Sequence, residues 1–229
     1  MIVSIVYTLA RPTVRAMNWG PFAAGVGLSF VVLVVPEVIS DTLTAAHLTT
    51  LLRVAAACVA LGAAFLLDDP ATRSTPTMPT SQLIRNAMRV AITVPVVGVW
   101  WAAALVVTTI GAGDGVAATL PRGALTLEAA ALVALALTIA SIGQRFSDNG
   151  SAGIVAAPTV LILFATVWFL PARVALVPAL GDPQWTPAHR RWAALLAVTI
   201  VCFAWASREP AAHRMARRPS APPRRLPER

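Results

Sequence analysis

Six apolar stretches, each long enough or nearly long enough to cross a lipid bilayer, set the strongest constraint on this chain. A membrane-spanning helix needs roughly 20 mostly apolar residues, because the hydrocarbon core is about 30 Å thick. Inside that core each backbone amide must find its partner within the protein, which favours α-helices. The sequence therefore predicts an all-α, polytopic integral membrane protein with six transmembrane helices. The stretches cover residues 19–35, 45–67, 88–110, 125–143, 152–170 and 191–206.

The composition agrees with this class. Apolar residues make up 57% of the 229 residues and charged residues only 12%, whereas soluble domains carry about 25% charged residues. The net charge of +8 does not indicate a nucleic-acid partner, because the arginines are dispersed between apolar stretches instead of gathering on one polar domain. The partner that this composition predicts is the lipid bilayer.

The arginines also predict an orientation. With six spans and a cytoplasmic N-terminus, thirteen of the 18 arginines lie on the cytoplasmic side and four lie outside. Cytoplasmic loops of membrane proteins carry such an excess of Arg, so both termini are predicted to be cytoplasmic.

Three segments follow along the chain. Residues 1–18 are predicted to form an interfacial N-terminal helix, because apolar residues recur there at helical spacing; a frayed start is the alternative. Residues 19–207 form the six-span transmembrane domain. Residues 208–229 are rich in Pro and Arg, which predicts a disordered, basic cytoplasmic tail.

No catalytic or metal site is evident from residue spacing. Cys58 and Cys202 both fall inside predicted spans, and His47, His189 and His213 lie near different span ends, without the spacing of metal ligands. The sequence "GAGDG" at 111–115 lacks the preceding strand and following Lys of a nucleotide-binding loop. The chain is therefore predicted to hold no metal or cofactor and not to be an enzyme.

Two ionisable residues intrude into the apolar stretches, both near their outer ends. We expect Arg53 to pair with Glu37 or Asp41, and Glu128 to pair with Arg122, at the outer membrane interface. A role in gating or substrate contact is the alternative. No ionisable group is expected at mid-membrane. If the chain is a transporter, its energy source must therefore lie on another subunit.

The connection between the second and third stretches contains helix-start signals. Asp69 is predicted to cap a short helix that begins at Pro70, where the missing N–H is tolerated, and Ser81 is a second cap. Beyond it, Arg85, Asn86 and Arg89 share one helix face, which predicts a basic surface toward the cytoplasm. An ordinary inter-helix loop remains the alternative.

Several short sequences resemble small actinobacterial permease subunits of ABC-2-type transporters. They are "FLLDDP" at 65–70, "LIRNAMR" at 83–89, "WW" at 100–101, "RRWAALLAV" at 190–198 and "ASREPA" at 206–211. The resemblance implies a multi-pass protein of the bacterial cell membrane, acting with a second permease copy or a related permease subunit. It also implies separate ABC ATP-binding subunits on the cytoplasmic side, which hold the ATP and Mg.

The resemblance also implies functional residues. Asp68, Asp69, Pro70 and Arg73 correspond to the element that couples the permease to the ATPase. A re-entrant hairpin on the outer side would fall at residues 174–181.

The function implied is export of a hydrophobic or amphipathic compound by alternating access. Trp100 and Trp101 either line the translocation path or only pack the helices together. The alternative function is a non-transporting membrane anchor or assembly subunit of a larger complex. The cargo and the choice between identical and different permease subunits stay open.

Overall fold

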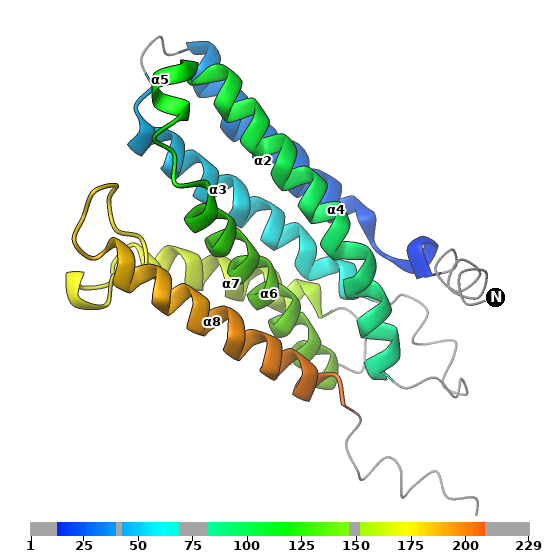
Figure 1. Cartoon of the computed structure of the whole chain (residues 1–229). Helices are drawn as coiled ribbons and strands as arrows, with labels where there is room; N and C mark the ends of the chain where they lie inside the picture. Colours follow the sequence, from blue (N-terminus) through cyan, green and yellow to red (C-terminus); the bar gives the residue numbers. More distant parts are fainter. Residues whose placement is uncertain (1–12, 40–42, 69–81, 147–151, 209–229) are drawn as a thin grey trace, which may run out of the picture.

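The computed structural model describes residues 13–39, 43–68, 82–146 and 152–208, and every regular element in these ranges is helical (Figure 1). The coupling residues Asp69, Pro70 and Arg73, together with Asp41 and Ser81, lie outside the described residues. The helices are α2 (Trp19–Ile39), α3 (Ala45–Ala63) continued by η1 (Ala64–Leu67), α4 (Gln82–Gly111), α5 (Gly113–Ala117), α6 (Arg122–Phe146), α7 (Gly153–Val167), η3 (Ala172–Val174) and α8 (Trp185–Ala206).

Among the residues that the structure describes, four helices are long and apolar enough to cross a membrane: α2, α3 with η1, α4 and α6. Helix α7 has 15 residues, or about 22 Å, which is less than the bilayer core of about 30 Å. Helix α8 has 22 residues, but Arg190 and Arg191 lie in its second turn. The prediction of an all-helical protein with long apolar helices is confirmed, and the count of six spans stays a prediction.

Helix α3 lies at the centre of the bundle. In the most apolar part of α3 with η1, 72% of the residues are buried, whereas the corresponding share in α2 is 17%. In Figure 1, α2 and α4 run along one side of α3, while α6, α7 and α8 lie on its other side. Alanines dominate the buried face of α3, and their small side chains let four neighbouring helices approach it closely.

Glycines set the contact between α2 and α3. A Cβ atom on Gly25 would lie 2.6 Å from the carbonyl oxygen of Cys58, and one on Gly62 would lie 2.9 Å from the Cα of Phe22. Small residues at such positions are typical of helix pairs in membranes, where close backbone approach supplies the packing energy.

Polar contacts between helices gather at both ends of the bundle, and different residues make them at each end. At one end, Asp68 bonds to Gly153 and Asn86 bonds to Ser207, so the ends of α3, α6 and α8 meet the starts of α4 and α7. We call this the Asp68 end. The first and last described residues lie there too (Figure 1). At the other end, which we call the Arg53 end, α3, α6 and α8 meet the segment between η3 and α8.

The outer segments are only partly described. Residues 13–16 form one helical turn, but the predicted interfacial helix over 1–18 and the basic tail over 208–229 lie almost wholly outside the described residues. The segment 174–181, which the resemblance assigns to a re-entrant hairpin, begins at the last residue of η3 and continues as a loop over 175–181.

The close α2–α3 contact predicts that Gly25→Val destabilises the chain. The added side chain would meet backbone, and such overpacking costs about 1–3 kcal/mol. The apparent unfolding midpoint in detergent should fall by several degrees, at about 2–4 °C per kcal/mol. Gly27→Val is the matched control, because a Cβ there meets nothing within 4 Å. Equal midpoints for the two variants would contradict the described packing.

Candidate functional site

An apolar pocket of about 480 Å³ lies between α4, α6 and α8, and we call it the apolar groove. It forms because α4 packs mainly along α2 and touches α6 at few places, while α8 packs along α6. On α4 its lining runs from Val90 to Trp101, or about 16 Å along the helix axis. Prominent lining residues are Val94, Val97, Val133, Leu137, Ile200 and Phe203.

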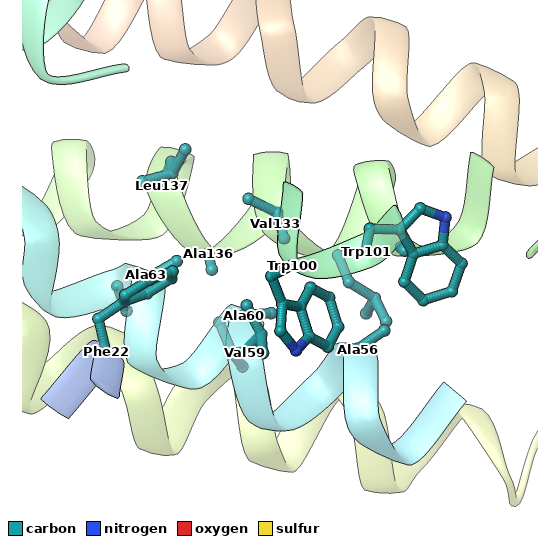
Figure 2. Close-up of a cluster of buried hydrophobic side chains, with 14 of the residues drawn as sticks. Phe22, Ala56, Val59, Ala60, Ala63, Trp100, Trp101, Val133, Ala136 and Leu137 are labelled. Atoms are coloured by element: carbon teal, nitrogen blue, oxygen red, sulfur yellow. The ribbon is translucent and has the colours of Figure 1, made fainter. Parts of the chain in front are cut away.

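Trp100 and Trp101 line the groove and also fasten α4 to its neighbours. The indole N–H of Trp100 donates to Ser29 Oγ of α2 at 2.9 Å, and that of Trp101 donates to Thr126 Oγ1 of α6 at 2.9 Å. Figure 2 shows the Trp100 ring beside Val59 and Ala60 of α3. The two tryptophans are therefore buried packing residues whose rings also form part of the groove wall.

The groove offers apolar contact and few free hydrogen-bonding groups. None of the described residues that line it is charged. The hydroxyls of Thr126, Thr138 and Thr199 already donate to backbone carbonyls of their own helices at 2.7–2.8 Å. A pocket of this volume fits a small ligand, and these walls favour an alkyl chain or another apolar group.

At the Arg53 end, Arg53 and Glu128 form a buried bidentate ion pair. Arg53 Nε and Nη2 donate to the two carboxylate oxygens at 2.7 and 2.8 Å, and Nη1 donates to the carbonyl of Pro178 at 3.2 Å. The guanidinium also lies 5.5 Å from the centre of the Trp185 ring. Arg53 lies about 12 Å from the start of α3, measured along the helix axis.

This pair corrects two predictions. Arg53 was expected to meet Glu37 or Asp41, and Glu128 to meet Arg122, but Arg53 and Glu128 meet each other. The physical reason is that the two parallel N–H groups of a guanidinium match the two oxygens of a carboxylate. One such pair therefore neutralises two buried charges. Arg122 donates instead to the carbonyl of Ala117 at 3.3 Å. Glu37 Oε1 is buried without a hydrogen-bond partner among the described residues.

His189 joins this pair from α8, which the sequence did not reveal. Its Nε2 lies 3.0 Å from Glu128 Oε1, and its Nδ1 lies 2.8 Å from the carbonyl oxygen of Trp185. The ring also stacks on Trp185, with ring centres 4.6 Å apart. Three helices thus bring charged or titratable groups together in one buried cluster.

At the Asp68 end, the side chain of Asp68 points into the bundle. It is buried, and its Oδ1 accepts a hydrogen bond of 2.8 Å from the N–H of Gly153, the first residue of α7. Burial raises the pKa of Asp68, although the N–H groups of Gly153 and Ala152 and the charge of Arg89 oppose this shift. Asp68 therefore caps α7 and ties it to the end of η1.

The polar face of α4 also points inward. Asn86 and Arg89 are buried, while Leu83 and Ile84 are exposed. The predicted basic surface toward the cytoplasm is therefore wrong for Asn86 and Arg89. In lipid the outward face of a helix should be apolar, and polar groups turn to partners inside the protein.

A network of hydrogen bonds receives these polar groups. Arg89 and Gln144 both donate to the carbonyl of Leu67, and Asn86 donates to Gln144 Oε1 and Ser207 Oγ, each at 3.3 Å. Ser141 Oγ lies 3.2 Å from Ser207 Oγ. The network satisfies the free carbonyl at the end of η1 and joins α3, α4, α6 and α8.

Arg145 closes the same end by capping α8. Its Nη2 donates to the carbonyl of Trp205 at 2.8 Å, and the guanidinium also bonds to the carbonyls of Ala206 and Arg208. It lies 4.5 Å from the centre of the Trp205 ring. A cation at a helix C-terminus is favourable for the helix dipole. The only sequence signal for this role was the position of Arg145 after the fourth apolar stretch.

Comparisons of the chain with protein-family models, curated proteins and solved structures give no match. Within the described ranges no group of three His, Cys, Asp or Glu side chains could hold a metal ion.

The environment of Asp68 predicts a pH-dependent stability. An acid whose pKa is higher in the folded than in the unfolded chain binds its proton more tightly when folded, so stability falls as the pH rises through that interval. The interval begins near the ordinary value of 3.8 and extends upward. Asp68→Asn keeps an acceptor for Gly153 but carries no charge, so its unfolding midpoint should decline less between pH 4 and 7.

Asp182→Asn is the matched control for this measurement. Asp182 Oδ1 accepts from the N–H of Gln184 at 2.7 Å, in the loop at the Arg53 end. The control should keep the pH dependence of the native chain. If Asp68→Asn keeps it as well, Asp68 is not the titrating group.

Proposed function

We propose that this chain is the transmembrane permease subunit of an ATP-driven ABC exporter, and that a hydrophobic or amphipathic compound moves through the apolar groove by alternating access. The observation that carries the proposal is the groove itself, about 480 Å³ of space between α4, α6 and α8 without a charged lining residue. ATP with Mg would be hydrolysed on separate ATP-binding subunits, as the resemblance to ABC-2-type permeases implies. This chain would perform no chemistry on the compound.

The proposed topology has six spans, with α7 and α8 as the fifth and sixth. Arg85, Arg89, Arg145 and Arg208 all lie at the Asp68 end, which supports a cytoplasmic position for that end and for both termini. Helix α7 is shorter than the bilayer core. Its outer end would therefore not extend beyond the membrane, and the loop between α7 and α8 would lie at the outer interface. The bacterial cell membrane is the proposed location.

In this arrangement the coupling element begins at Asp68. Asp68 fixes the end of η1 to the start of α7, and Arg89 fixes the start of α4 to the carbonyl group of Leu67, the residue before Asp68. A force applied by an ATPase to Asp69, Pro70 and Arg73 would therefore reach three helices together. Asp68 would act as the anchor of this element, while the following residues would contact the ATPase.

The moving parts would be two helix pairs. Helix α4, which packs along α2, forms one wall of the groove, and the pair α6–α8 forms the other. Because α4 touches α6 at few places, moving α4 away from α6 would break little apolar packing besides the hydrogen bond from Trp101 to Thr126. A second permease copy or a related subunit would complete the path.

A non-transporting membrane anchor or assembly subunit is the second candidate. It is favoured by the satisfied hydroxyls of the groove, because walls without free polar groups also suit the apolar side of a partner helix. The two candidates differ in what occupies the groove and in whether ATP hydrolysis depends on it.

The proposal predicts that Gly98→Leu blocks the groove. Gly98 lines the groove, and a Cβ there meets nothing within 4 Å, so Leu would fill space without touching backbone. Photolabelling of α4, α6 and α8 by a diazirine-bearing palmitoyl probe should fall about tenfold, which corresponds to about 1.4 kcal/mol of lost contact. Gly27→Leu is the matched control, because Gly27 also faces open space.

Two outcomes would count against the proposal. Equal labelling of both variants would show that the probe does not bind in the groove. The native chain should also copurify, in mild detergent, with an ATP-binding subunit encoded beside it, and the hydrophobic probe should stimulate the ATPase of that complex. If the groove binds the probe but no ATPase copurifies, the anchor or assembly function is favoured instead.

A further inference from the structure

The buried cluster at the Arg53 end has no part in the proposed transport path. We propose that Glu128 and His189 form a proton-binding site, in which a protonated His189 fastens the start of α8 to α6 and α3. The inference rests on the positions of polar atoms and does not depend on the proposed function.

The two ring nitrogens of His189 face different groups. Nδ1 lies 2.8 Å from the carbonyl oxygen of Trp185, and a carbonyl oxygen only accepts hydrogen bonds, so Nδ1 carries a hydrogen. In a neutral imidazole Nε2 would then present a lone pair. It would face Glu128 Oε1 at 3.0 Å, which places two electron-rich atoms in contact. A proton between the two atoms converts this repulsion into an attraction.

The proton between His189 and Glu128 belongs to His189. Both oxygens of Glu128 accept hydrogen bonds from Arg53, at 2.7 and 2.8 Å. A bidentate guanidinium binds the ionised carboxylate, so the proton belongs on Nε2 and His189 is an imidazolium. The contact is an ion pair of 3.0 Å without the alignment of a full hydrogen bond, and Nε2 has no other partner among the described residues.

Other charged groups that the structure describes in the elements around His189 are not partners of its Nε2. Arg53 is the cation that α3 contributes, and its nitrogens are bonded to Glu128 and Pro178. The remaining groups are either exposed or bonded elsewhere: His47, Arg122, Arg173, Asp182, Arg190 and Arg191. Glu128 is therefore the anion that faces the proton.

Aromatic and backbone groups stabilise the resulting pair of cations. The Trp185 ring lies 5.5 Å from the guanidinium of Arg53 and 4.6 Å from the centre of the His189 ring, and an aromatic face attracts cations. The carbonyls of Pro178 and Trp185 also face the two cations. The side chains of Arg53 and Glu128 are 5% and 3% exposed, so water screens these contacts weakly.

The consequence is a proton-dependent attachment of α8. His189 lies in the second turn of α8, and Arg53 holds the preceding loop through Pro178. Loss of the proton returns the lone pair of Nε2 to Glu128, which loosens this end of α8 from α6. Since α8 forms one wall of the groove, the proton would also influence the groove if the proposed transport function holds.

The direct test is ¹⁵N NMR of histidine-labelled full-length protein in detergent micelles. The chain has three histidines, and His189→Gln identifies the signals of His189 by their loss. We expect the native His189 ring to carry hydrogens on both nitrogens at neutral pH. In Glu128→Gln the signal from Nε2 should change to that of an unprotonated nitrogen, while Glu37→Gln should leave it unchanged. A native His189 with an unprotonated Nε2 at neutral pH would overturn the proposal.

A second measurement follows the stability against pH. If the ion pair between protonated His189 and Glu128 holds α8, its contribution to stability is present while His189 carries the proton and is lost when the proton leaves. The apparent unfolding midpoint of the native chain should exceed that of His189→Gln by about 2–4 °C below neutral pH, and the difference should disappear in alkaline buffer. His47→Gln is the matched control. A constant difference at every pH would contradict the proton site.

Discussion

Polar groups that lie among apolar helices must find partners inside the protein, and this constraint determines much of the arrangement. The ion pair between Arg53 and Glu128 is its clearest case, because neither charge could remain in lipid alone. Forming the pair requires α3 to face α6 at one register. Once they do, the carbonyl of Pro178 and the ring of Trp185 complete the surroundings of Arg53 and bring α8 into place.

The same constraint operates at the opposite end. Asn86, Arg89, Gln144 and Ser207 turn inward and bond to one another or to the carbonyl of Leu67. With charged contacts concentrated at the two ends, the middle of the bundle depends on apolar packing and a few neutral hydrogen bonds such as those of Trp100 and Trp101. Where α4 diverges from α6, that packing leaves the apolar groove, whose walls have no charge to neutralise. This arrangement is the physical basis of the proposed path for a hydrophobic compound.

Sequence reasoning located the helices but not their contacts. The second apolar stretch, residues 45–67, coincides with α3 and η1, because length and apolarity fix a membrane-spanning helix locally. The partner of Arg53 could not be found in this way, since Glu128 lies 75 positions along the chain and their meeting depends on tertiary packing. The start of α4 was misjudged for a different reason. A polar face predicts exposure in a soluble protein, but in lipid the same face predicts burial.

The role of ionisable groups also changes in the light of the cluster. The sequence suggested that Arg53 and Glu128 lie near the surface, which left ATP as the energy source. Their contact with His189 places a third ionisable side chain beside the pair, where we propose a proton-binding site. An ATP-driven cycle remains the proposed function, and the proton site would adjust how firmly α8 is held during it.

The most direct test of the account is which face of α4 meets lipid. Spin labels would be placed singly along α4 in nanodiscs, with Cys58 and Cys202 replaced by Ala. We expect labels at the exposed positions Ile84, Val99 and Val106 to collide freely with lipid-soluble oxygen, whereas labels at the buried positions Asn86 and Thr93 should be shielded from both oxygen and water-soluble reagents. Accessibility with the opposite pattern, with Asn86 open to the aqueous reagent and Ile84 shielded, would contradict it.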